Sequence, residues 1–464
     1  MKPSKYPDNI NLRMLAFIQN IRLFIRNTGF SFWFYLALFL LSLLYIIGFI
    51  FPRVATVAHG ATWFFVLVAV SDLILLNYRK HSLKITRSLP QRFSNGDDNI
   101  VPICCQSLFP FTIRVHLIDE IPVQFQYRDM SFYIMISAEG SHQLSYSVKP
   151  LHRGNYEFGR TLAYVYSPVR LLSRRFVVEN ETTIPVYPGF IQMQKYQMMV
   201  ISNRLVDAGI KPIRKVGHHS EFDQIRHYIS GDDYRLINWK ATARKAEPMV
   251  NQFIEEKSQP VYSLIDMGRN MQSPFHGMTL LDYAINTSLI ISNIALLKSD
   301  KAGLVTFSKN IDSLLPATNQ AIQMNRIMEL LYKAQTRFDE PNYELLYGTL
   351  CRKITQRSLL LLFTNFESPV SLQKQLKYLA GLAKDHLLLV IFFKNTELYR
   401  LTHLEPKNTR EVYIQTIAEK LIFDKTLIEK ELHRYGILTL LTEPQNLTPQ
   451  IINEYLKVKA LGML

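Results

Sequence analysis

Two long apolar runs near the N-terminus limit the fold of this chain more than any other feature. Residues 30–51 (FSFWFYLALFLLSLLYIIGFIF) carry no charged side chain over roughly 22 residues, enough to cross a membrane as a helix. A second run, residues 57–76, follows after the short connection FPRVAT. We therefore predict a basic segment over residues 1–29 and a transmembrane hairpin over residues 30–77. A cleaved signal peptide is excluded because the first run is too long and no small-residue cleavage site follows it.

Basic side chains lie on both outer flanks of this hairpin, whereas its connecting loop holds only Arg53. The flanking residues are Lys2, Lys5, Arg13, Arg22 and Arg26 before it and Arg79, Lys80, Lys84, Arg87 and Arg92 after it. The positive-inside rule then predicts an inner-membrane protein whose termini and soluble domains are all cytoplasmic. Asp72 lies near the cytoplasmic end of the second run, and we interpret it as a carboxylate that reaches the membrane interface.

Composition narrows the class of protein further. The formal net charge of +15 is strongly basic. Much of that excess lies at the membrane flanks and no recognition motif is present, so we do not expect nucleic-acid binding. The three cysteines, Cys104, Cys105 and Cys351, form no disulfide framework, and two of them are adjacent. This cysteine usage is typical of a reducing compartment.

The region 82–190 changes to short alternating segments with turn signals between them. FTIRVHLID, VQFQYRD, SFYIMISAEG, HQLSYSVKP and TTIPVYPGF are examples. Several short strands at this spacing predict an antiparallel β-sandwich-like domain. The run Lys149 to Gly159 (KPLHRGNYEFG) is interpreted as a glycine-bounded hairpin whose aromatic pair packs inside the sandwich.

The connecting segment 191–257 contains the most distinctive run of the chain, dense in Arg, Asp, Tyr and Trp. Its marked residues are Glu221, Arg226, Tyr228, Gly231, Asp232, Asp233, Arg235, Asn238, Trp239, Lys240 and Arg244. We predict a turn at Gly231 and a helix from Tyr234 to Arg244 with Asp at its N-cap. Trp239 is then expected to be buried between the β domain and the following domain. The alternative is acid/base chemistry by the two carboxylates with His218 or His219.

Residues 258–464 alternate between apolar strands and amphipathic helices. Expected strands are 260–266, 302–307, 358–366, 386–393 and 436–441, with DSLLP as an antiparallel neighbour of the second. This order predicts a parallel sheet covered on both faces by helices. Ligands of such sheets bind at the carboxyl ends of the strands, which here carry Asp266 to Asn270 and Thr364 to Glu367.

These residues together resemble the "domain of unknown function 58" family of bacterial membrane-anchored proteins. The resemblance rests on HRGNYEFG, SEFDQIRHYISGDDYRLINWKATAR, IDMGRNM and INEYLKVKALG, and it spans nearly the whole chain. It implies two membrane helices, a β domain and a von Willebrand factor A-like, Rossmann-type domain. Genes of the family commonly sit beside those of MoxR-type AAA+ ATPases. No activity is established for the family as a whole.

A von Willebrand A-like domain also implies a metal site of the pattern D-x-S-x-S, completed by a Thr and an Asp from two other loops. Here Asp266 is kept, but Gly268 has no side-chain ligand and Asn270 offers only an amide oxygen. Asn365 stands where the second Asp is expected, and Thr318 is the candidate Thr. We expect this degenerate site to bind no cofactor, since Mg²⁺ favours more anionic sites.

Two classes of function remain open. The first is a non-enzymatic adaptor that works with a MoxR-type AAA+ ATPase in the assembly or maturation of envelope protein complexes. The alternative is a hydrolytic enzyme that uses the acidic, His and Arg residues of 218–244. A pocket that gathers those groups favours the enzyme, whereas ion pairs that saturate them disfavour it.

Overall fold

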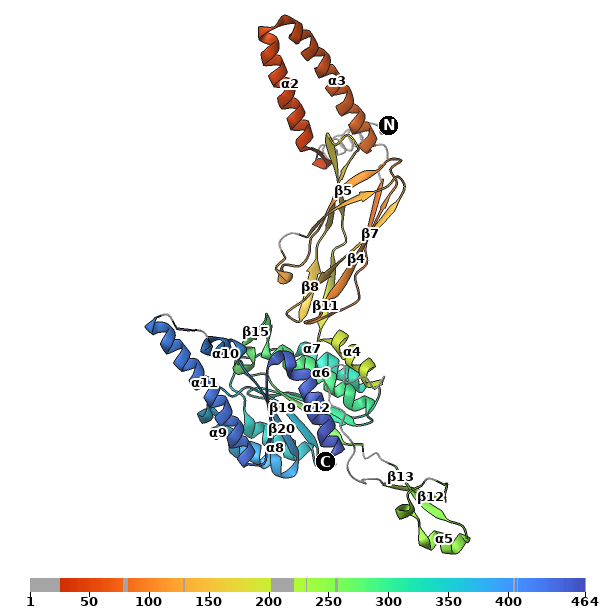
Figure 1. Ribbon diagram of the computed structural model, residues 1–464, viewed down its shortest axis with the longest axis vertical. Coiled ribbons are helices and arrows are strands. Elements are labelled where there is room, and N and C mark those ends of the chain that lie inside the picture. The colour runs from red at the N-terminus through yellow and green to blue at the C-terminus, as the bar shows by residue number, and fades with distance from the viewer. Residues whose placement is uncertain are drawn as a thin grey trace, which may run out of the picture. The chain divides into compact units, whose positions relative to one another are not determined.

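The computed structural model describes residues 26–77, 82–127, 130–201, 221–230, 232–254, 258–403, 405–406 and 408–463, without the side chains of 221–224 and 252–254. The chain divides into two compact units. The first unit comprises Met1–Phe93, Asp98–Pro150 and Gly154–Val186. The second unit comprises Ser94–Asp97, Leu151–Arg153 and Tyr187–Leu464. Figure 1 labels their helices and strands.

The two apolar runs form a pair of packed helices, α2 (Phe32–Ile50) and α3 (Pro52–Asn77). Both are long and apolar enough to cross a membrane. A third helix, α6 (Leu280–Leu297), also meets that criterion, but most of it is buried inside the second unit. Its length and apolar content therefore belong to the core of a globular fold.

Both ends of the helix pair attach to one strand, β10 (Leu172–Val178). Strand β1 (Thr28–Phe30), just before α2, pairs with β10 in antiparallel fashion. At the end of α3, Asp72 Oδ2 accepts the backbone N–H of Leu172 at 2.8 Å, and Asp72 is fully buried. The Asp72 carboxylate, which the sequence places near the membrane interface, is therefore a buried hydrogen-bond acceptor that joins α3 to β10.

The rest of the first unit is built from antiparallel strands. They are β2 (Leu83–Arg87), β3 (Phe93–Ser94), β4 (Asn99–Ser107), β5 (Ile113–Asp119), β6 (Ser131–Ile136), β7 (Ser141–Val148), β8 (Gly154–Phe158), β9 (Thr161–Tyr166) and β11 (Thr182–Tyr187). The sheet orders are β1-β10-β9-β5-β6, β2-β4-β7 and β3-β11-β8, and one hydrophobic core joins them. Tyr156 and Phe158 are buried in that core, as predicted for the aromatic pair.

A buried ion pair lies within the first unit. Arg87 Nη1 is 2.7 Å from Asp119 Oδ1, and both side chains are 0% exposed. The hydroxyl groups of Thr161 and Tyr146 also donate to the Asp119 carboxylate. Burial, followed by the charge of Asp119, raises the pKa of Tyr146 far above its ordinary value. Arg87, counted from the sequence as a membrane-flanking charge, therefore neutralises a carboxylate inside the β structure.

The second unit is built on a six-stranded sheet of order β18-β17-β14-β19-β20-β21. The strands are β14 (Pro260–Asp266), β17 (Lys301–Phe307), β18 (Ile311–Thr318), β19 (Leu359–Phe363), β20 (Leu387–Phe393) and β21 (Leu438–Thr442). All neighbouring pairs are parallel except β17 with β18. The predicted parallel sheet and its antiparallel edge strand are therefore confirmed.

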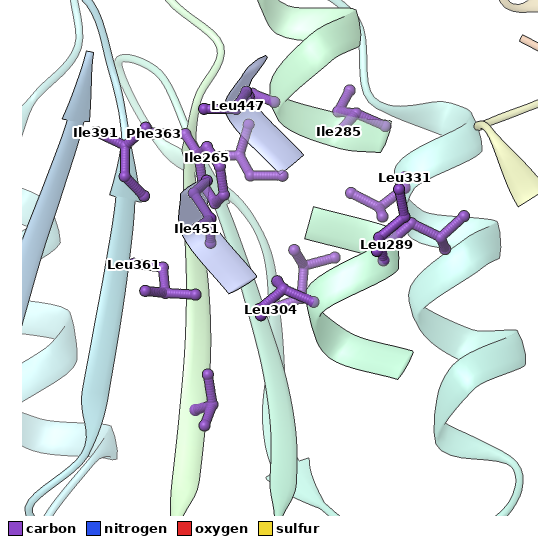
Figure 2. Close-up of a cluster of buried hydrophobic side chains, with 14 of the residues drawn as sticks. Ile265, Ile285, Leu289, Leu304, Leu331, Leu361, Phe363, Ile391, Leu447 and Ile451 are labelled. Carbon is purple, nitrogen blue, oxygen red and sulfur yellow. The ribbon is translucent and has the colours of Figure 1, made fainter. Parts of the chain in front are cut away.

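Helices cover both faces of this sheet, and each face has its own core. One core contains residues of α6 with α4 (Phe190–Ile201), α7 (Gln323–Lys333) and α12 (Leu447–Ala460). Figure 2 shows Ile265, Leu304 and Leu361 of the sheet within it. The other core contains residues of α8 (Tyr343–Lys353), α9 (Pro369–Asp385) and α11 (Thr409–Arg434). Two buried faces explain why the strands are continuously apolar rather than alternating.

The distinctive run folds as a two-stranded antiparallel ribbon, β12 (Glu221–His227) with β13 (Met249–Ile254). The predicted single helix from Tyr234 to Arg244 is wrong. A short 3₁₀ turn, Tyr234–Leu236, is capped by Asp233 as expected, but Ile237 then forms a bridge to Val250. Helix α5 (Trp239–Lys245) begins only after Asn238, whose side chain accepts the Ala241 N–H. The two Asx caps divide the segment because each favours a new helix start.

Candidate functional site

The carboxyl ends of β14 and β19 lie side by side at the point of the sheet where successive connections leave in opposite directions. From β14 the chain crosses through α6 to β17, and it returns through α7 and α8 to β19 on the other side of β14. In open α/β sheets this switch point bounds the crevice in which ligands bind. The predicted strand-end residues do meet there, since Asn270 and Asn365 each donate a side-chain N–H to the backbone carbonyl of the other.

Asp266, the last residue of β14, is enclosed by hydrogen-bond donors. Its Oδ1 accepts the Gly268 N–H at 2.7 Å, and its Oδ2 accepts the Thr364 hydroxyl at 2.7 Å. The Tyr343 hydroxyl lies 3.4 Å from the same Oδ2. Asp266 is 1% exposed, and this burial raises its pKa to about 6 despite those three donors. The carboxylate is thus part of a buried polar cluster.

Gly268 is required for the turn that encloses Asp266. A Cβ atom there would lie 2.9 Å from Asp266 Oδ1, 2.9 Å from Pro341 and 3.0 Å from the carbonyl oxygen of Asp339. The two contacts below 3.0 Å require an atom to move, and both are to side chains. The serine that the metal motif requires at this position would therefore have to displace Asp266 Oδ1 and Pro341.

A lysine occupies the other side of the strand ends. Lys425, from α11, donates from Nζ to Asn365 Oδ1 at 2.6 Å and to the carbonyl oxygen of Phe366 at 2.5 Å. Burial lowers the pKa of Lys425 to about 8, partly offset by the nearby carboxylate of Glu367. The ammonium therefore supplies a fixed positive charge next to Asn365 at neutral pH.

Thr318, the candidate second-loop ligand, does not lie at the end of the sheet that holds Asp266. Its register partner in the antiparallel pair is Ala302, near the start of β17, whereas Asp266 pairs with Phe307 at the end of the same strand. Five residues of extended chain separate those two levels by roughly 16 Å. The assignment of Thr318 to the site is therefore wrong, because β18 runs antiparallel.

These residues do not fit a divalent cation. Asp266 is saturated by donors, and the Asn365 amide oxygen already accepts a hydrogen bond from Lys425. Lys425 also adds a positive charge where Mg²⁺ would need negative charge. Among the described residues no group of three or more His, Cys, Asp or Glu side chains is placed to hold a metal ion.

A pocket of about 310 Å³ opens beside these strand ends. It is lined by residues that follow β14, β19 and β20 and by residues of α10 (Thr396–Thr402) and α11. Its wall is largely apolar, and its charged groups are the side chains of Lys394, Lys425 and Glu367. A volume near 300 Å³ is at the lower end of ligand-binding pockets.

In the distinctive run, the paired carboxylates have separate partners. Asp232 accepts two hydrogen bonds from Arg226, each 2.8 Å, and one from the Ile229 N–H at 2.9 Å. The Arg226 hydrogen bonds lower the pKa of Asp232, with the Ile229 bond adding to this. Asp233 accepts the Arg235 N–H as a cap.

The described residues do not include His218, His219, Gly231 or the side chain of Glu221. The ion pair disfavours a catalytic role for Asp232, since a general base must be free.

Trp239 is 72% exposed, so the expectation that it is buried at a domain junction is wrong. Tyr234 and Ile229 are likewise exposed, by 68% and 65%, and Tyr228, Lys240 and Arg244 are exposed as well. The described hydrogen bonds and ion pairs of 225–251 all join residues of this same ribbon, including Asn238 Nδ2 to Asn251 Oδ1 at 2.7 Å. The ribbon thus presents large apolar side chains to solvent.

The sequence did not indicate that Tyr343 and Thr364 are hydrogen-bond partners of Asp266, or that Lys425 belongs to this site. Thr364 stood within a marked strand end, but its role depends on the pairing of β14 with β19. Lys425 is one of many charged residues in α11, and no local pattern distinguishes it. Its distance of 60 residues from Asn365 hides the contact.

The fold and the site define an α/β protein with two apolar N-terminal helices and a strand-end pocket that holds a lysine in place of a metal site. Residues 224–420 match the model of a family described as "Protein of unknown function DUF58". The uncharacterized protein YeaD of Bacillus subtilis (strain 168) is 28% identical over 127 residues, which are 27% of this chain. The match spans 31% of that relative's length.

Solved structures give only low overall similarity. The conserved hypothetical protein BatB from Bacteroides thetaiotaomicron is 13% identical, with a TM-score of 0.29, over 44% of this chain and 98% of that one. The PapD-like domain 7 of human CEP192 is 12% identical, with a TM-score of 0.18, over 23% of this chain and 87% of that one.

Proposed function

We propose that this chain is a membrane-tethered, non-enzymatic interaction protein with a von Willebrand factor A-like domain, and that it works with a MoxR-type AAA+ ATPase in assembling or maturing envelope protein complexes. The observation that carries the proposal is the exposed apolar surface of the ribbon, Ile229, Tyr234 and Trp239. Exposed clusters of large apolar side chains commonly mark protein interaction sites. The ATPase is suggested by the gene neighbourhoods of the family that the sequence resembles.

The experiment is a Trp239→Ala substitution in the full chain. Because Trp239 is 72% exposed, we expect its free energy of unfolding to stay within about 0.5 kcal/mol of wild type. Capture of the ATPase should fall by roughly tenfold, as for an aromatic hot-spot residue. Hydrogen–deuterium exchange of the β12 and β13 amides measures the stability, and cross-linking in native membranes with quantification of the ATPase measures the capture.

Tyr435→Ala is the matched control for this experiment, since Tyr435 is a 51% exposed aromatic residue outside the ribbon. It should leave both readouts unchanged. Equal capture by wild type and Trp239→Ala would remove the ribbon from the interface, and recovery of no AAA+ ATPase from wild-type membranes would overturn the partner.

We further propose that the chain lies in the inner membrane with both termini and both units in the cytoplasm. The basic flanks support this orientation. The attachment of both hairpin ends to β10 supports placing them on one side of the membrane. Reporter fusions after Arg92 and at the C-terminus are expected to be active only with a cytoplasmic reporter. A periplasmic signal from either fusion would contradict the orientation and the compartment of the ATPase.

The proposal includes no bound Mg²⁺. Because Lys425 donates to Asn365 and Asp266 is saturated, we expect calorimetry of the purified chain to give no Mg²⁺ or Mn²⁺ affinity tighter than roughly millimolar. Asp266→Ala serves as the control. Micromolar affinity in the wild type that disappears in this variant would show that the strand ends still bind metal.

A further inference from the structure

One face of α11 carries an exposed apolar stripe that leads to Lys425. Tyr413, Ile417 and Leu421 are spaced four residues apart and are 67%, 58% and 38% exposed. Residues at this spacing lie above one another on a helix, and Lys425 continues the series. We call Tyr413, Ile417, Leu421 and Lys425 the α11 stripe. It extends over about 18 Å of helix, which is longer than a small molecule in a 310 Å³ pocket.

The stripe ends in the pocket, which Leu421 and Lys425 both line. Buried Phe275 and Phe393 form part of its apolar wall. An ammonium group has three N–H donors. Lys425 uses two of them on Asn365 and Phe366, and no ion pair joins it to a carboxylate among the described residues.

The charges of the pocket favour an anion. Lys394 and Lys425 line it against the single acidic side chain of Glu367, which is exposed to solvent. Glu367 is near Lys425 but forms no direct ion pair with it among the described residues, so a carboxylate that enters the pocket and contacts the ammonium would compensate its burial. The outer part of α11 is mixed in charge, with Glu411 and Glu419 near the apolar residues, which disfavours an anionic lipid surface as the occupant.

We propose that the α11 stripe and its pocket bind a helical segment of a partner protein, with apolar side chains that pack on Tyr413, Ile417 and Leu421 and an Asp or Glu carboxylate that accepts the third N–H of Lys425. The partner helix packs against α11 along this stripe, and its own apolar side chains recur at three- and four-residue spacing so that they share one face. The fixed lysine then serves as the cation that recognises the acidic side chain. This surface is separate from the exposed residues of the ribbon, so the proposal stands without the proposed ATPase.

The test is a selection from a displayed library of helical peptides against the full chain in detergent micelles. Every fourth position of the peptides is varied among Ala, Leu, Ile, Phe, Gln, Glu and Lys. We expect enriched peptides to carry apolar residues at successive varied positions, followed by Glu. The best peptide, titrated by fluorescence anisotropy, should bind roughly tenfold more weakly when its Glu is changed to Gln, as expected for a charge-assisted hydrogen bond.

Variants of the chain complete the test. Lys425→Met should weaken binding of the peptide by a similar factor. Lys430 is an exposed lysine on another face of α11, and Lys430→Met should leave binding unchanged. Ile417→Asp, at a 58% exposed position, keeps the test valid if Lys425→Met fails to fold, and it should abolish binding. No enrichment over Ile417→Asp, or equal binding to Lys425→Met, would overturn the proposal. So would a dimer in sedimentation that Ile417→Asp dissociates, because the face would then pair copies of this chain.

Discussion

Replacing Asp119 with alanine is expected to lower the free energy of unfolding of the β structure by about 3 to 5 kcal/mol. The substitution leaves the guanidinium of Arg87 buried, with 0% side-chain exposure and without its carboxylate. It also removes the acceptor of the Thr161 and Tyr146 hydroxyl groups. An unpaired buried charge is much less stable than the pair, because the interior cannot replace the water that the charge has lost.

Hydrogen–deuterium exchange is the suitable measurement, since the chain has two units and a single unfolding transition is not assured. Amides of β4, β5 and β9 report on opening of this core in the full chain. Arg160→Ala is the control, because its ion pair with Glu181 is 51% and 66% exposed and should leave exchange unchanged. If Asp119→Ala exchanges as slowly as wild type in these strands, the ion pair does not stabilise the core.

The second large effect is a pH dependence that originates at Asp266. Burial raises its pKa to about 6 in the folded chain, above its ordinary value of 3.8. Between these two values the folded state holds the proton more than the unfolded state does, so this residue lowers stability as the pH rises from about 4 to about 6. The full difference is on the order of 3 kcal/mol, because each pKa unit corresponds to about 1.4 kcal/mol.

Asp266→Asn should remove that dependence. An amide can still accept the Gly268 N–H with its oxygen and donate to Thr364 with its nitrogen, so the local geometry is kept. We expect the stability of the variant relative to wild type to rise by about 2 to 3 kcal/mol between pH 4 and pH 7. Exchange of β14 and β19 amides at the two pH values measures it. If the stability difference between Asp266→Asn and wild type is the same at pH 4 and pH 7, Asp266 is not the titrating group.

The sequence alone determined the features that depend on neighbouring residues. Apolar length marks α2 and α3 as long enough to cross a membrane, although α6 meets the same criterion and is buried in the second unit. The alternation of β-branched and leucine-rich strands with amphipathic helices predicts the sheet of the second unit. Residue identity at positions 268, 270 and 365 was sufficient to predict a degenerate metal motif.

Only the tertiary structure decided which distant groups share a site. The antiparallel direction of β18 places Thr318 at the opposite end of the sheet from Asp266, although each is the last residue of its strand. The course of α11 brings Lys425 to Asn365 across 60 residues. Trp239 has the aromatic character of a core residue, yet its ribbon leaves it exposed. The hydrophobic pattern of a segment predicts whether that segment can be buried. The residues that it contacts are decided by how the strands and helices cross, because those contacts join residues far apart in the sequence, which no local periodicity relates.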